Sequence, residues 1–162
     1  MILGAGGYGR TVADVAEQLG YDVSFLDDHA AIAKDTCDRF ESYIAEDTFF
    51  YPAFGNNEGR LNWLKRLVDS GCNVPVLIHP TAYVSPKAQV LMGTTVLPKA
   101  IINTGTIVNA GCIINCGAIV DHDCILDEGV HVCLGAVVKG ENHIPSCMKV
   151  EAGTVINNRE YQ

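Results

Sequence analysis

Aliphatic residues recur at every sixth position through the second half of the chain. Counted from Ile78 in steps of six, fourteen successive positions are Ile, Leu or Val, and the series ends at Ile156. A period of six fits neither the 3.6-residue repeat of an α-helix nor the 3.5-residue repeat of a coiled coil. A fixed short period over a long stretch is typical of folds in which each repeat packs on its neighbours. We therefore expect residues 76–162 to form one stacked repeat domain.

A second ladder, mostly of small residues, follows four positions after each aliphatic one. Most of its members are Ala, Thr or Cys, Gly often stands just before them, and Asn142 and Met148 interrupt the series. Each hexad then makes one short strand and one tight corner, with the aliphatic side chain inside. Three hexads close a triangular coil, so fourteen give about four and two-thirds coils. The pattern predicts a parallel β-helix whose repeat blurs at residues 141–143.

Residues 1–75 alternate between strand-like and helix-like patterns instead. Short apolar runs at 1–3, 23–26 and 48–54 predict three strands, and Pro52 favours an edge position for the last. Apolar residues at helical spacing predict helices over 11–19 and 61–68. We expect a small Rossmann-like β-α-β subdomain that is too short for a complete dinucleotide-binding domain.

A glycine-rich turn separates the first predicted strand from the first predicted helix. Residues 4–9 fit the pattern G-x-G-x-x-G, and the acids Asp27 and Asp28 follow the second strand. This is the dinucleotide fingerprint, and it makes an NAD-dependent oxidoreductase a distant alternative. The same turn presents backbone N–H groups at a helix N-terminus, which suit any phosphate. A nucleotide-sugar diphosphate fits this physics as well as NAD does.

The charge balance narrows the classes of partner. Lys and Arg number 11 against 19 Asp and Glu, a net charge of −8, and no basic run is present. We therefore expect neither nucleic-acid nor membrane binding. The sequence shows no apolar stretch of about 20 residues and no signal-peptide pattern. The odd number of cysteines, seven, predicts reduced thiols in the cytoplasm, and no metal-binding pattern is evident.

Three motifs resemble the sugar O-acyltransferase group of hexapeptide-repeat acyltransferases. The strongest lies at residues 115–124 (NCGAIVDHDC), with others at residues 129–132 and 54–57. That group includes sialic acid O-acetyltransferases and N-acetyltransferases of nucleotide-linked 4-amino sugars. The resemblance implies a left-handed β-helix acyltransferase domain at 76–162, preceded by a nucleotide-sugar-binding subdomain at 1–75. It also implies acetyl-CoA as co-substrate.

The resemblance assigns roles residue by residue. His122 matches the catalytic base, and Asp123 matches the acidic residue beside it. The acetyl-CoA and acyl pocket is matched by Asn115, His131 and Gly140. The nucleotide-sugar site is matched by Gly6, Gly7, Tyr8, Asp27, Asp28 and Asn56.

The residues themselves agree with acyl transfer from a thioester. Histidine is the usual base because its ordinary pKa of about 6.5 lies near the working pH. A carboxylate bonded to its other nitrogen fixes the tautomer, and either Asp121 or Asp123 is close enough in sequence to do so. Amines and hydroxyls use the same base, so N- and O-acetylation remain open.

The spacing of two histidines predicts an oligomer. His131 lies nine residues after His122, or one and a half hexads, and therefore belongs to a different face of the prism. The two side chains can converge only between subunits, and a triangular prism suits a homotrimer. One alternative function stays open. Because the chain has few hexads after Gly140, it can instead be a trimeric nucleotide-sugar-binding module with little or no catalysis.

Overall fold

The computed structural model describes all 162 residues and divides the chain into two compact units, Met1–Pro75 and Val76–Gln162. The first unit has a three-stranded parallel sheet in the order β2-β1-β3. Its strands are β1 (Ile2–Leu3), β2 (Phe25–Leu26) and β3 (Tyr51–Pro52). Its helices are α1 (Gly7–Gln18), the 3₁₀ helix η1 (Cys37–Tyr43) and α2 (Asn57–Asp69). The predicted β-α-β arrangement is confirmed, with Pro52 on an edge strand.

The helices of the first unit begin earlier than the apolar spacing alone predicts. Helix α1 begins at Gly7, inside the glycine-rich turn, because Gly6 takes the extended N-cap conformation there. Helix α2 begins at Asn57, and the side chain of Asn56 caps it by accepting a hydrogen bond from the Gly59 N–H. The 3₁₀ helix η1 was not predicted. Neither α1 nor α2 has the length and apolar character needed to cross a bilayer.

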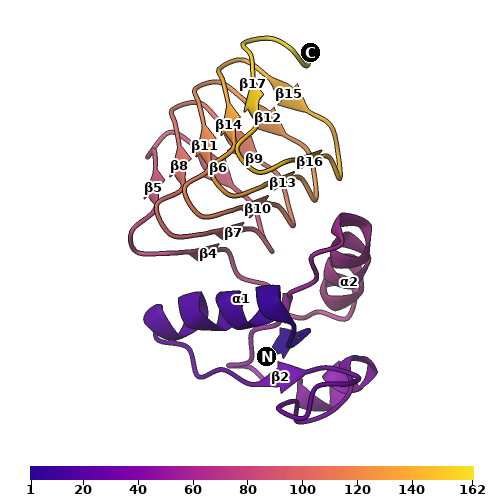
Figure 1. The fold of residues 1–162 in the computed structure, drawn as a ribbon. Coiled ribbons are helices and arrows are strands. Elements are labelled where there is room, and N and C mark those ends of the chain that lie inside the picture. The colour runs from indigo at the N-terminus through magenta and orange to yellow at the C-terminus, as the bar shows by residue number, and fades with distance from the viewer. The chain divides into compact units, whose positions relative to one another are not determined.

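The second unit is a parallel β-helix, in which three sheets run along a stack of coils (Figure 1). The β4 sheet contains β4 (Leu77–Ile78), β7 (Thr95–Val96), β10 (Ile113–Ile114), β13 (His131–Val132) and β16 (Lys149–Val150). The β5 sheet contains β5 (Tyr83–Val84), β8 (Ile101–Ile102), β11 (Ile119–Val120), β14 (Val137–Val138) and β17 (Val155–Ile156). The β6 sheet contains β6 (Gln89–Val90), β9 (Ile107–Val108), β12 (Ile125–Leu126) and β15 (His143–Ile144). This confirms the repeat fold predicted from the six-residue period.

The core of the β-helix is the aliphatic ladder, the series of every sixth residue from Ile78 to Ile156. Paired strands are offset by eighteen residues, so each inner side chain stacks on its counterpart one coil away. From Val96 to Ile156 every member of the ladder is buried, whereas Ile78, Val84 and Val90 are only partly so. Burial of a full aliphatic side chain stabilises a fold by about 1.5–3 kcal/mol, so this continuous column is a main source of stability for the β-helix.

The repeat continues through residues 141–143, where the sequence pattern blurs. Asn142 takes the small-residue corner position and is only 1% exposed. Its amide nitrogen donates to the carbonyls of Lys139 and Asn157, and its oxygen accepts from the Tyr161 N–H. A buried amide is tolerated when its hydrogen bonds are satisfied, so polar chemistry replaces apolar packing at this corner. Three further strands, β15 to β17, follow it.

Candidate functional site

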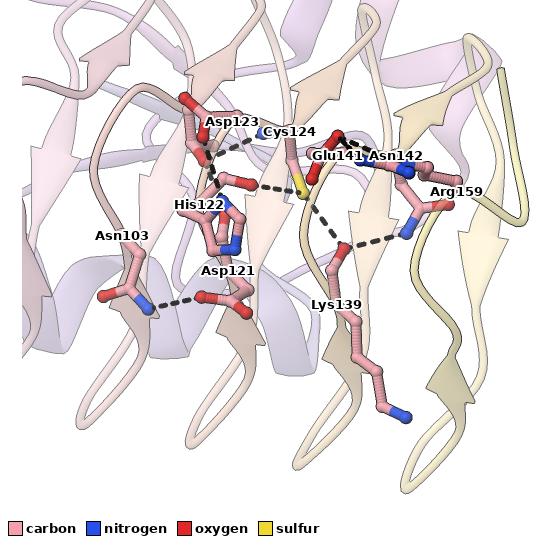
Figure 2. A network of polar contacts seen from close by, with 10 residues as sticks. Asn103, Asp121, His122, Asp123, Cys124, Lys139, Glu141, Asn142 and Arg159 are labelled. Atoms are coloured by element: carbon pink, nitrogen blue, oxygen red, sulfur yellow. Dashed lines mark hydrogen bonds and ion pairs between the residues drawn. The ribbon is translucent and has the colours of Figure 1, made fainter.

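The corner between β11 and β12 carries His122 on the outside of the β-helix. Val120 points into the core and Cys124 returns to it, so residues 121–123 form the corner itself. The His122 ring is 42% exposed, and its Nδ1 lies 2.9 Å from Asp123 Oδ2 (Figure 2). A carboxylate can only accept, so Nδ1 carries the shared proton when the ring is neutral. Nε2 then keeps a lone pair and can act as a base.

The two aspartates beside His122 have different partners. Asp123 binds the histidine, whereas Asp121 Oδ1 accepts from Asn103 Nδ2 on the preceding coil at 2.9 Å. The Asn103 amide, aided by nearby backbone N–H groups, lowers the pKa of Asp121 below its ordinary value. Asp123 reaches the ring because its backbone adopts φ 55°, in the left-handed region. The sequence left open whether Asp121 or Asp123 pairs with His122, and the backbone conformation at Asp123 decides it.

The electrostatic surroundings favour the protonated form of His122. The hydrogen bond that His122 donates to Asp123 raises the pKa of the imidazole. The charges of Asp121, Asp123 and Glu141 add to the rise, while partial desolvation opposes it. Glu141 itself is paired with Arg159, with the Nη2–Oε2 distance at 2.7 Å. The histidine is therefore a stronger base than a free imidazole.

Gly140 lies directly against the His122 ring. A Cβ added at residue 140 would stand 2.7 Å from Nε2 and 2.8 Å from Cε1, closer than non-bonded atoms approach. Only a glycine lets the backbone of the next coil pass so close to the imidazole. The sequence predicts Gly140 as a cofactor contact, and its observed contact is with the ring of His122.

Asn115 and His131 form a separate cluster at the corner that leads into β11. Asn115 Nδ2 lies 3.1 Å from His131 Nε2, and Asn115 Oδ1 accepts from the Cys116 N–H at 2.8 Å. Asn115 follows β10, and His131 stands on β13 one coil further along. Within one chain this cluster and the His122 corner lie at opposite ends of the strands of the β5 sheet, because Asn115 precedes β11 and His122 follows it.

In the first unit, Asp27 ties two loops together at the carboxyl edge of the sheet. Its Oδ2 accepts from the Ala5 N–H at 2.8 Å, and its Oδ1 accepts from the N–H groups of His29 and Ala30. These backbone bonds, led by that of Ala5, lower the pKa of Asp27. Ligands of parallel α/β sheets bind at this carboxyl edge. The aspartate therefore shapes the glycine-rich loop through its own backbone contacts.

Of the other residues predicted to bind a nucleotide-sugar, some bond to neighbouring parts of the first unit and others are exposed to solvent. Asp28 Oδ1 accepts from the Cys37 N–H at 3.0 Å, and the Tyr8 hydroxyl lies 3.3 Å from that of Tyr51. Gly6 and Gly7 are exposed, and a Cβ at either would meet no atom within 4 Å. The loop surface at Gly6 and Gly7 is thus open to solvent.

The chain matches a family model and several solved structures. Residues 1–67 match the model of the PglD N-terminal domain. The acetyltransferase domain of PglB from Neisseria gonorrhoeae FA1090 is 34% identical, with a TM-score of 0.94 over 98% of this chain and 82% of that one. The chain belongs to the hexapeptide-repeat sugar acetyltransferases. The family resemblance predicted from its motifs is confirmed.

Further structures extend this view of the acetyltransferase. The same Neisseria domain is known in complex with acetyl coenzyme A. A variant of GDP-perosamine N-acetyl transferase from Caulobacter crescentus, in complex with CoA and GDP-perosamine, is 21% identical. Its TM-score is 0.78 over 97% of this chain and 87% of that one. At that identity the likeness establishes the shared fold. Membership of the family makes this protein an acetyl-CoA-dependent sugar acyltransferase.

One structural residue of the acetyltransferase carries no recognisable sequence signal. Arg60 on α2 is completely buried, and its Nη1 donates to the Phe54 carbonyl at 2.9 Å while Nη2 donates to Asn57 Oδ1 at 2.9 Å. It fixes the loop of residues 54–57, which was singled out as a motif. A lone arginine in a helical pattern is ordinarily a solvated surface residue, so burial could not be expected.

Replacing Asp27 by asparagine should destabilise the first unit. The amide group of the new side chain would face backbone donors with its own donor, at a cost of about 1–2 kcal/mol for a part-exposed site. The pKa of Asp27 is lowered by folding, so its contribution is present above its unfolded pKa and is lost as the pH falls through the folded pKa. Urea unfolding should therefore show a difference between D27N and wild type at pH 7 that shrinks in acid. An equal difference at both pH values would contradict this role.

Proposed function

We propose that this protein transfers the acetyl group of acetyl-CoA to an amine of a nucleotide-linked sugar, with His122 as general base. The observation that supports the proposal is the His122–Asp123 pair on an exposed corner, with the Nδ1–Oδ2 distance at 2.9 Å. An amine is the proposed acceptor because a relative of the same fold is named an N-acetyl transferase.

The chemistry follows from the protonation state of His122. Its neutral ring gives the Nδ1 proton to Asp123 in a hydrogen bond and takes a proton from the attacking amine at Nε2. The nitrogen adds to the thioester carbonyl, and the tetrahedral intermediate collapses by breaking the C–S bond. CoA leaves as a thiolate and receives a proton, so the products are the amide and free CoA. Asn115 and His131 are proposed to line the acyl pocket.

The nucleotide end of the substrate is proposed to lie on the first unit. Gly6 and Gly7 present open backbone at the start of α1, where N–H groups favour phosphate oxygens. Tyr8, Asp28 and Asn56 follow β1, β2 and β3 respectively, so each comes after the carboxyl end of a strand of the same sheet. We further propose that the reaction takes place in the cytoplasm, where thiols stay reduced.

An acetyl-transfer assay tests the proposed function directly. Purified protein is incubated with acetyl-CoA and either UDP- or GDP-linked 4-amino sugars, or the same sugars with a hydroxyl in place of the amine. Release of CoA thiol with an amino sugar, together with a mass-verified amide product, is the expected result. Transfer to the hydroxyl sugars alone would overturn the amine assignment. No release with any acceptor would favour the alternative of a nucleotide-sugar-binding module.

We also propose that the working form is a homotrimer packed through the β5 sheet. Its outward positions are apolar in all five coils, and Tyr83 and Val155 are 54% and 50% exposed. The sheet lies between the Asn115–His131 corner and the His122 corner. A three-fold arrangement about this sheet brings the His122 corner of one copy toward the Asn115–His131 corner of the next, and so completes the site.

A charge placed on the β5 sheet should separate the copies. I119R puts a cation on the central outward position of that sheet, and we expect light scattering to show monomers and the assay to show a loss of kcat. I125R is the matched control, because Ile125 is an outward isoleucine of the β6 sheet and is 38% exposed. Dissociation by I125R but not by I119R would contradict the proposed interface, as would a monomeric wild type.

A further inference from the structure

Gly105 occupies the corner one coil before Asp123, and the carboxylate of Asp123 lies over it. A Cβ added at Gly105 would overlap Asp123 Oδ1 and stand 3.2 Å from Asp123 Cγ. Gly105 also has φ +73°, which its place in the corner requires. The side chain of Asp123 therefore fills the space that a larger residue at 105 would take.

Other corner glycines show that the turn alone does not explain this contact. Gly117, Gly135 and Gly153 also have φ between 62° and 70°, and a Cβ at each would meet no atom within 4 Å. At these three positions glycine is needed only for the positive φ of the turn. At Gly105 the missing side chain serves a second purpose, because the neighbouring coil places a functional carboxylate there.

The carboxylate of Asp123 is held between two neighbours. Oδ2 lies 2.9 Å from His122 Nδ1, while Oδ1 faces Gly105. Asp123 itself sits at φ 55°, a region that few residues other than glycine occupy, and its N–H donates to the Thr104 carbonyl at 3.0 Å. With the backbone fixed in this way, an obstructed carboxylate can respond only by rotating its side chain, which breaks the bond to His122.

We propose that Gly105 is a positioning residue for the acetyl-transfer site, because its missing side chain lets the Asp123 carboxylate hold the His122 ring. The inference rests on the proposed function of His122 as base. Gly105 touches no reacting atom and acts through Asp123, eighteen residues away in sequence. We expect a bulkier residue at 105 to displace the Asp123 carboxylate and so release the histidine from its acid partner.

The direct test is an NMR titration of the His122 imidazole in the free protein. We expect G105A to lower the pKa of His122, as D123A does, because the hydrogen bond that raises it is lost. The charges of Asp121 and Glu141 still face the ring, so part of the rise should remain. G153A is the matched control, since Gly153 has φ +70° and an open Cβ position. An unchanged His122 pKa in G105A would overturn the proposal.

Kinetics separate the positioning role from a general loss of fold. G105A should reproduce the fall in kcat of D123A with an unchanged KM for acetyl-CoA, and it should have no further effect in the D123A background. If G105A folds poorly, G105N and G153N form a second matched pair, because asparagine tolerates positive φ. Equal effects of the two glycine variants on kcat would overturn the proposal. Loss of the His122 pKa shift without loss of activity would instead overturn the proposed role of His122.

Discussion

H122A is expected to lower kcat for acetyl transfer by about 10²- to 10⁴-fold, the usual contribution of a positioned general base. The Nδ1–Asp123 bond leaves Nε2 as the ring's available base, and no other imidazole shares the corner between β11 and β12. Steady-state assays with the amino-sugar acceptor measure the effect. KM for acetyl-CoA should change little, because the substitution removes proton transfer and leaves the coils intact.

The chain offers a matched control for H122A. His143 on β15 also pairs with an aspartate, with its Nε2 3.0 Å from Asp127 Oδ1, and it is similarly exposed. H143A should keep wild-type kcat because His143 pairs with Asp127 and has no bond to the His122–Asp123 pair. Equal losses in the two variants would contradict a specific role for His122.

If His122 is the base, the activity should rise with pH as its imidazole loses a proton. The reaction needs neutral His122, and folding raises its pKa above 6.5, so kcat/KM should climb along a limb that lies above pH 6.5. D123N removes the largest cause of the rise and should move that limb to lower pH, at a reduced maximum rate. A limb that stays in place in D123N would mean that another group controls the protonation step.

G140A is expected to cause a loss of kcat that approaches that of H122A. The added Cβ would collide with Nε2 and Cε1 of His122, so the ring must turn out of its position and lose the Asp123 bond. Gly140 is not among the glycines with positive φ, so alanine there meets no left-handed backbone strain. Thermal unfolding should therefore change little while the measured kcat falls by about 100-fold, as misplacement of a reacting group does.

A double substitution distinguishes two roles for Gly140. If the glycine acts only through His122, G140A should have no additional effect on kcat in the H122A background. If it acts mainly as a contact for acetyl-CoA, as the family resemblance implies, G140A should instead raise KM for acetyl-CoA at nearly constant kcat. The second pattern would contradict the packing role assigned to Gly140.

Much of the fold was predictable because its specification is local and repeated. Each hexad has an aliphatic residue for the interior and, in most cases, a small residue for the corner. Because the aliphatic position recurs fourteen times, the period is unambiguous. The short strands of the first unit were placed less well, since only two residues of each pair as strand and η1 has no periodic signal. Asn142 departed from the pattern because hydrogen bonds satisfied it in place of apolar packing.

For the candidate site, the sequence and the tertiary structure each determined a different part. The sequence alone determined the repeat and, by resemblance, the family and its acetyl-transfer chemistry. Only the tertiary structure decided that Asp123 and not Asp121 holds the histidine, and that Gly105 and Gly140 leave room for the pair. These contacts depend on the left-handed backbone at Asp123 and on the eighteen-residue register that stacks one coil on the next. The hexads specify that coils form, but which side chains meet across coils is fixed only when the whole stack closes on its core.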